Sequence, residues 1–162
     1  KGVHVLIDAA RKTGLPVKII GDGPDRKELE KQAGAMTNVE FLGHVPHERV
    51  LEYMAGARAV IVPSVWWEPF GLVALEPQAL GVPVISSQIG GLAEVTVHGQ
   101  TGLQVEPGDV EQLAQAMQRL WDHPAEARRM GEMGKRRVES QYRVDDHLDQ
   151  LERVYKELTD EK

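Results

Sequence analysis

The sequence has 162 residues, of which 41% are hydrophobic and 27% charged, with a formal net charge of −6, as expected for one soluble globular domain. Interspersed acidic and basic residues argue against a nucleic-acid-binding surface, and the lack of cysteine excludes disulfides, thiolate catalysis and zinc–sulfur sites. No apolar run approaches the roughly 20 residues of a membrane span and no signal peptide is recognisable, so a cytoplasmic location is expected.

Strands and helices alternate in the predicted structure as far as residue 105. Apolar residues at Val3, Leu6, Ile7 and Ala10 predict a helix over residues 2–13. Strands are predicted at 16–20, 39–42, 59–62, 82–86 and 103–105, and further helices begin near Asp25, after Pro46 and after Phe70. Three helices should follow, over 110–121, over 125–141 (weakened by Gly131 and Gly134) and around 148–158.

Alternation of this kind predicts βαβ units, hence an α/β fold with a mainly parallel sheet and helices on both faces. Ligands of such sheets bind beyond the carboxyl ends of the strands. Glycine-rich breaks follow the predicted strands directly, so they should line one rim. These breaks lie at Gly21, Gly43, residues 63–71 and Gly90.

The break at residues 63–71 carries the strongest chemical signal. Gly71 lies at a predicted helix N-terminus, where free N–H groups favour an anion. Glu68 and Glu76 flank this start and could act as a general acid and base, as metal ligands or as groups that bind sugar hydroxyls. Metal binding is disfavoured, because no histidine or third acid lies close by in the sequence.

Other candidates have simpler interpretations. Trp66 and Trp67 could form a sugar-stacking platform, but packing of at least one under the loop is favoured. Gly21-Asp-Gly-Pro24 is better read as a tight turn than as a dinucleotide fingerprint, with a phosphate-side contact from Gly21 left open. Histidines in loops, and the basic cluster at 128–137, fit a solvated surface.

The segment Glu68-Pro-Phe-Gly-Leu-Val-Ala-Leu-Glu76 resembles the signature of retaining glycosyltransferases with the GT-B fold, the group 1 (family 4) set. The resemblance covers roughly residues 1–140 and lies in an ordered set of motifs. These are Lys1-Gly2, Ile20-Gly-Asp-Gly-Pro24, Phe41-Leu-Gly43, Val62-Pro-Ser64, Gly81-Val-Pro-Val-Ile85, Gly90-Gly-Leu-Ala-Glu94, Gly99-Gln-Thr-Gly-Leu103 and Pro107-Gly-Asp109.

This resemblance implies the carboxyl-terminal domain of the GT-B fold, a Rossmann-like three-layer sandwich. Residues 1–140 would bind a nucleoside diphosphate sugar, and residues 141–162 would form the last helix of the same domain. The implied reaction is retaining transfer of a hexose to an acceptor, without a metal or other cofactor. The partner would be an amino-terminal acceptor-binding half, through which any membrane contact would be made, and the isolated domain should bind nucleotide weakly and transfer little or no sugar.

The resemblance also implies a role for individual residues. Glu68 would contact hydroxyls of the transferred sugar, Lys1 the diphosphate and Glu76 the ribose hydroxyls. Backbone amides around Phe70, Gly71 and Leu72 would lie at the phosphates and sugar. Gly43 and Val45 would flank the base, and Gly90 and Gly91 the phosphates.

The sequence departs from the family pattern in three places. The family's first strand of this domain, which lies mid-sheet and ends in Gly-Arg ahead of the lysine, is not in this sequence, and neither is the acceptor-binding amino-terminal half. Pro77 stands where the family more often has alanine. Two alternatives therefore stay open: a related GT-B enzyme, such as a sugar-nucleotide epimerase or a glycogen synthase relative, and a non-catalytic nucleotide-binding or scaffolding module.

Overall fold

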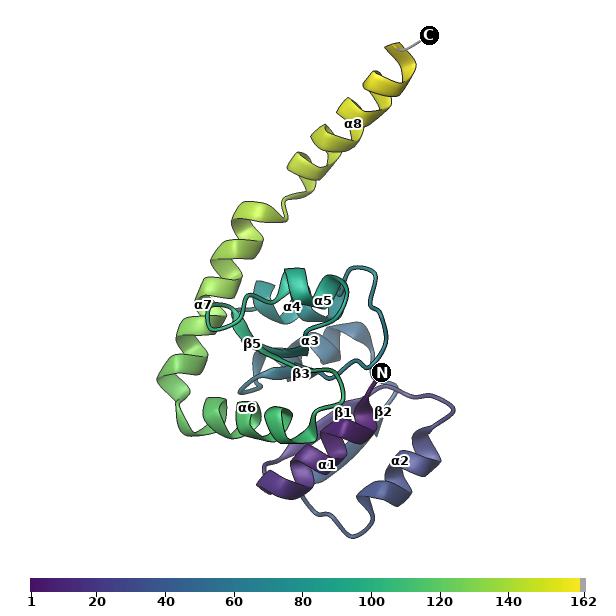
Figure 1. Ribbon diagram of the computed structural model, residues 1–162, viewed down its shortest axis with the longest axis vertical. Helices are drawn as coiled ribbons and strands as arrows, with labels where there is room; N and C mark the ends of the chain where they lie inside the picture. Colours follow the sequence, from purple (N-terminus) through teal and green to yellow (C-terminus); the bar gives the residue numbers. More distant parts are fainter. Residues whose placement is uncertain (161–162) are drawn as a thin grey trace.

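The computed structural model describes residues 1–160 and confirms the α/β class (Figure 1). Its strands are β1 (Val17–Ile20), β2 (Val39–Gly43), β3 (Val60–Val62), β4 (Val84–Ser87) and β5 (Gly102–Val105). Its helices are α1 (Val3–Thr13), α2 (Arg26–Ala33), α3 (His47–Ala55), α4 (Leu72–Ala79), α5 (Gly91–Val95), α6 (Val110–Asp122), α7 (Pro124–Gln141) and α8 (Val144–Asp160). The short helix α5 was not predicted, since Gly90-Gly91 was interpreted as a turn.

Every strand pairing within the described residues is parallel, as predicted, but the sheet is in two pieces. β1 pairs with β2, and β3, β4 and β5 form a separate sheet in that order. This division agrees with the family's mid-sheet first strand not being in this sequence. Within residues 1–160, β1 and β3 each have one edge without a strand partner.

Helices cover both faces of the larger sheet, which makes three layers. Successive residues of β4 point to opposite faces. Ile85 belongs to a core cluster shared with α1, α6 and α7, whereas Val84 belongs to a second cluster with Ala74 of α4 and Leu92 of α5. Figure 1 shows the same arrangement, with α4 and α5 across the sheet from α6.

A groove of about 830 Å³ lies between the two sheets. Val17 and Ile20 of β1 line one side and Val60 and Ile61 of β3 the other. Leu6 of α1 and the residues Ile85, Met117 and Leu120 also line it. The groove is mainly apolar, although it runs beside two strand edges whose backbone polar groups lack a strand partner among residues 1–160.

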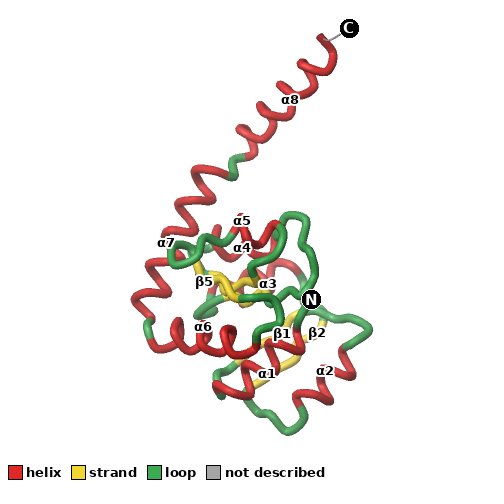
Figure 2. The backbone as a smooth tube through the Cα atoms, in the orientation of Figure 1, coloured by secondary structure: helices red, strands yellow, loops and turns green. Residues whose placement is uncertain are grey.

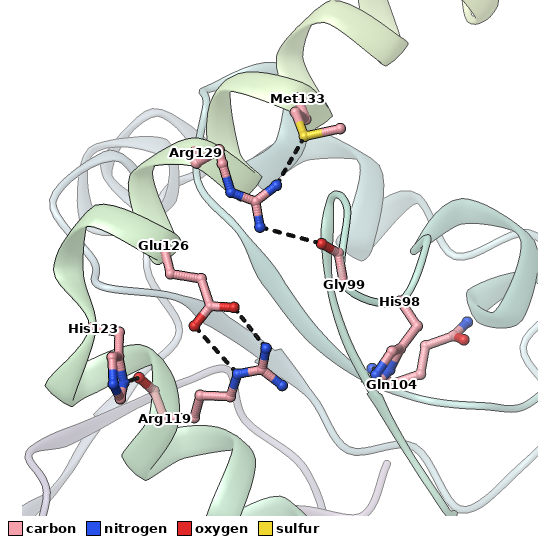
Figure 3. A network of polar contacts seen from close by, with 8 residues as sticks. All are labelled: His98, Gly99, Gln104, Arg119, His123, Glu126, Arg129 and Met133. Carbon is pink, nitrogen blue, oxygen red and sulfur yellow. Dashed lines mark hydrogen bonds and ion pairs between the residues drawn. The ribbon is translucent and has the colours of Figure 1, made fainter.

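Polar contacts join α6 to α7, and α7 to the turn that precedes β5 (Figure 3). The Arg119 Nη2 of α6 donates to Glu126 Oε1 of α7 at 2.6 Å, and the guanidinium of Arg129 donates to the Gly99 carbonyl at 3.4 Å. His98 accepts the Gln104 N–H at 3.0 Å. These side chains hold turns in place, which agrees with a structural rather than a catalytic role for His98.

The last helix, α8, extends away from the body of the molecule (Figure 2). Every residue from Val144 to Thr159 is exposed, including the large apolar side chains Leu148, Leu151, Tyr155 and Leu158. No helix among residues 1–160 combines the length and apolarity needed to cross a membrane.

Candidate functional site

The loop of residues 63–71 connects β3 to α4 at the carboxyl end of the strand, where the sequence predicted it. Lys1 reaches this loop because Gly2 lies directly against Pro63. A Cβ at Gly2 would stand 1.8 Å from the Pro63 carbonyl oxygen, and Gly2 has a φ of 76°. Only glycine allows this approach.

The carboxylate of Glu68 receives three hydrogen bonds on one oxygen. Lys1 Nζ donates to Glu68 Oε1 at 2.6 Å, Ser64 Oγ at 2.9 Å and the indole Nε1 of Trp66 at 2.9 Å. Glu68 is only 7% exposed. The two predicted catalytic residues, Lys1 and Glu68, are therefore in direct contact.

The hydrogen bonds to Glu68 set its protonation. Burial by itself would raise the pKa of Glu68, but the donors Lys1, Ser64 and Trp66, together with the Lys1 charge, lower it below its ordinary value of 4.5. Glu68 is consequently ionised at neutral pH, as a group that accepts hydrogen bonds should be.

Gly90 and Gly91 hold this loop from the other side. The Gly91 N–H donates to the Glu68 carbonyl at 2.8 Å. A Cβ at Gly90 would stand 2.4 Å from the Glu68 carbonyl oxygen, and one at Gly91 would stand 2.4 Å from that of Phe70. Both glycines were predicted to lie beside the phosphates of the donor. In the structure their lack of a side chain lets the backbone at residues 90–91 pack against the backbone at residues 68–70.

Phe70, Gly71 and Leu72 lie at the start of α4. Gly71 is its N-cap residue, with a φ of 91°, and a Cβ there would stand 2.8 Å from Leu92 Cδ2. Phe70 and Leu72 are exposed, and the Phe70 ring meets Tyr142 edge-on with centroids 6.2 Å apart. The first N–H groups of an α-helix lack intrahelical partners, so this turn offers donors to an anion.

Glu76 is half-buried on α4, one turn beyond the start of the helix. Among residues 1–160 its side chain has no hydrogen-bond or ion-pair partner, in contrast to Glu68. Pro77 follows it without ending the helix, which continues to Ala79.

The remaining predicted residues lie around the other sheet. The Gly21 N–H donates to the Gly43 carbonyl at 2.8 Å, which joins the ends of β1 and β2. A Cβ at Gly43 would stand 2.7 Å from Arg26 Nη1. Gly21 and Val45 line the groove between the sheets, as does Val73 of α4. Lys1, Glu68 and Glu76 are not among its lining residues, so the groove does not bring the two parts of the predicted site together.

Sequence reasoning missed the two neutral donors to Glu68. Ser64 was noted only as part of a motif, and Trp66 only as a stacking or packing residue. In the structure both tryptophans of the loop are exposed, Trp66 by 49% and Trp67 by 71%, so the expected packing of one beneath the loop is wrong. The signal that could have identified Trp66 is an indole N–H two residues before the glutamate that the motif singles out.

No group of three or more side chains suited to a metal ion occurs among residues 1–160. That donor binding needs no metal stays a prediction.

Comparison with known proteins places these features in a family context. The family model described as "Glycosyl transferases group 1" matches residues 1–137. A D-rhamnosyltransferase of Pseudomonas aeruginosa is 42% identical over 147 residues, which cover 88% of this chain and 38% of that protein. A glycogen synthase of Mycobacterium tuberculosis is 39% identical over 150 residues, which cover 88% of this chain and 36% of that protein. The chain thus spans well under half the length of these relatives.

Solved structures share the fold closely. A sucrose-phosphate synthase from Thermosynechococcus elongatus matches all of this chain and 43% of its own, at 32% identity and a TM-score of 0.87. The Anabaena protein HepE, solved in complex with UDP-glucose, matches 97% of this chain and 45% of its own, at 26% identity and a TM-score of 0.88. These neighbours identify the architecture as that of GT-B glycosyltransferases.

Proposed function

The chain belongs to the group 1 glycosyl transferases, and we propose that it is the donor-binding half of a retaining enzyme that transfers a hexose from a nucleoside diphosphate sugar to an acceptor. The observation that carries the proposal is the meeting of Lys1 and Glu68 beside the N-terminus of α4, at the rim where ligands of parallel sheets bind. The HepE complex with UDP-glucose supports a ligand of this class.

Each side chain suits one part of such a donor. Lys1 and the first turn of α4 would stabilise the diphosphate. Glu68 has Oε1 occupied by protein donors, so Oε2 would accept hydroxyls of the transferred sugar. Glu76, whose side chain is half-buried and has no partner among residues 1–160, would accept the two ribose hydroxyls.

The proposed reaction needs no protein nucleophile. The bond between the sugar C1 and the diphosphate oxygen breaks, and a bond forms from C1 to the acceptor oxygen on the same face. The acceptor proton passes to the leaving phosphate oxygen. Charge develops on the diphosphate as this occurs, and Lys1 with the α4 amides would stabilise that charge. Glu68 and Glu76 position the donor.

We expect the acceptor site to lie in a further, amino-terminal half, since the chain spans only 38% and 36% of the two relatives described above. Any contact with a membrane would be made by that half. The chain alone should therefore bind donor weakly and transfer little or no sugar.

Isothermal titration tests this function. UDP, GDP and ADP, and their glucose or mannose conjugates, are titrated into the folded chain and into Glu76→Ala. We expect one base to bind, and we expect Glu76→Ala to weaken binding by about tenfold or more, because paired charge-assisted hydrogen bonds are lost. Glu132→Ala, on an exposed position of α7, is the control.

The outcomes separate the alternatives. Absence of heat with every nucleotide on a folded chain would refute the donor-binding function. Binding without sugar transfer by the full-length protein would support the non-catalytic module. Conversion of the free nucleotide sugar without any acceptor would support an epimerase.

A further inference from the structure

Trp66 contacts both charged groups of the site with different parts of one side chain. Its indole edge donates to Glu68 Oε1 at 2.9 Å. Its ring face lies under the ammonium of Lys1, with Nζ 4.2 Å from the ring centroid. Lys1 and Glu68 also contact each other at 2.6 Å, so the three side chains form a closed triangle.

The exposure of these groups makes packing a poor explanation for Trp66. The indole is 49% exposed, whereas the carboxylate that it contacts is 7% exposed. A large aromatic side chain held half in solvent gives little hydrophobic stabilisation from its exposed part. The specific contact of Trp66 is made by the edge of the indole, which donates a hydrogen bond to Glu68.

We propose that Trp66 is a positioning residue that keeps Lys1 and Glu68 in place when the two separate to bind the donor, an inference that rests on the proposed function. Once Lys1 turns to the diphosphate, Glu68 loses the one charged donor that it has among residues 1–160. A buried carboxylate without donors is costly, and the N–H of Trp66 with the hydroxyl of Ser64 supplies the remaining ones.

The same arrangement fixes which oxygen faces the sugar. All three donors bind Oε1, so Oε2 is left to the ligand. The ring face meanwhile holds the ammonium near the loop through a cation–π contact after its ion pair has opened. The indole edge of Trp66 thus positions Glu68 for the sugar, and its ring face positions Lys1 for the diphosphate.

Two substitutions separate the edge from the face. Trp66→Phe keeps a ring under Lys1 but removes the N–H, whereas Trp66→Leu removes both. Tyr155→Phe, at an exposed position of α8 that lines neither the loop nor the groove, is the control. For each variant, titration measures the affinity for a free nucleoside diphosphate and for its sugar conjugate. The two ligands are UDP and UDP-glucose, GDP and GDP-mannose, or ADP and ADP-glucose, according to which base the wild type binds.

We expect Trp66→Phe to leave the affinity for the free diphosphate within about twofold of wild type and to lower that for the diphosphate sugar about tenfold, the cost of one hydrogen bond to a charged group. Trp66→Leu should in addition lower the affinity for the free diphosphate about twofold to fivefold, because the cation–π contact is lost. Equal weakening of both ligands by Trp66→Phe would indicate a merely structural role and overturn the proposal, as would unchanged affinities.

The contact itself can be tested without any nucleotide. In ¹H–¹⁵N spectra, the indole N–H signal that Trp66→Phe removes should shift in Glu68→Gln, and that of Trp121 should not. A Trp66 signal unaffected by Glu68→Gln would refute the positioning role even if the chain binds donor. A chain that binds no nucleotide but shows the shift would refute the proposed function instead.

Discussion

Glu68 should make the stability of the chain depend on pH. Its pKa is lowered in the folded state, so its contribution to the free energy of unfolding is fully present above the ordinary value of 4.5 and disappears as the pH falls through the folded-state pKa. Glu68→Gln removes the titration, and it should cost about 1–2 kcal/mol at pH 7 after allowance for the exposure of Lys1.

Urea unfolding of wild type and Glu68→Gln between pH 7 and pH 3 measures this effect. The difference between the two proteins should be largest at neutral pH and should shrink below pH 4.5. Glu157→Gln, at an exposed position of α8, controls for the loss of one negative charge. A constant difference across the range would show that the carboxylate charge is not what stabilises the loop.

The chemistry of the site could be predicted from the sequence more fully than its contacts. Glu68 and Glu76 could be predicted as site residues because both lie in one segment of nine residues that also contains the start of a helix. The contact from Lys1 to Glu68 joins positions 67 residues apart, and no local pattern encodes it. It depends on Gly2 meeting Pro63, which only the packed structure reveals.

At the scale of elements, Gly131 is required by packing although it weakens the isolated helix. A Cβ at Gly131 would stand 1.9 Å from the Gly81 carbonyl oxygen, where α7 meets the turn after α4. Alanine gains about 1 kcal/mol in helix propensity. Overpacking against backbone costs about 1–3 kcal/mol or more, and so close a contact lies at the upper end.

We therefore expect Gly131→Ala to destabilise the chain by at least about 1 kcal/mol in urea unfolding. Glu132→Ala, at the next and exposed position, should change stability by less than about 0.5 kcal/mol. If Gly131→Ala were as stable as wild type, helix propensity rather than packing would govern this position.

The helix α8 should contribute nothing to the stability of the described body. All its residues from Val144 to Thr159 are exposed, and no hydrogen bond described within residues 1–160 connects it to a residue before Arg143. A chain ending at Arg143 should unfold at the same urea concentration as the full chain, with a smaller helical signal in circular dichroism.

A chain that ends before Arg137 provides the contrast. It loses the hydrogen bonds from Arg137 to the carbonyls of Val95, at 2.7 Å, and Glu94, at 3.1 Å, and it should be clearly less stable. If removal of α8 alone destabilised the chain, the helix would have to pack on the body in solution, as expected for the last helix of the same domain.

Most elements could be predicted because their signals are local. A run of β-branched residues indicates a strand, and apolar residues three or four positions apart indicate a helix. Each of these patterns lies within a few consecutive residues, so the strands and the long helices were predicted. The five-residue helix α5 buries only Leu92 and Val95 and begins at a glycine, which is too short a pattern to indicate a helix. Division of the sheet is a property of strand order, which no single segment encodes.

At the scale of the whole molecule, the groove between β1 and β3 has the form of a vacant strand position. Both flanking strands are parallel to their neighbours and have edges without a strand partner among residues 1–160, and apolar side chains line the groove from both sides. Lys1 and Gly2 lie beside Pro63, at the carboxyl end of β3. A strand that ended just before Lys1 would therefore run parallel to β1 and β3, and α1 would provide the right-handed crossover to β1.

We expect a strand added ahead of Lys1 to join the two sheets into one. A valine- and isoleucine-rich segment of six residues, connected by a short glycine-containing turn, should protect from hydrogen exchange those amides of Val17–Ile20 and Val60–Val62 that face the groove, because these gain ladder hydrogen bonds. The N–H groups of Val17 and Val60 already donate to the carbonyls of Asn38 and Pro83 on the other side of their strands, so their protection should not change. It should also raise the Tm, by about 2–4 °C for each kcal/mol gained. The control carries proline at alternate positions of the same segment, which keeps much of the apolar character but removes ladder donors. Equal protection and equal Tm in the two extended chains would show that the groove takes apolar side chains without forming a sheet, and the vacant strand position would then be the wrong description of it.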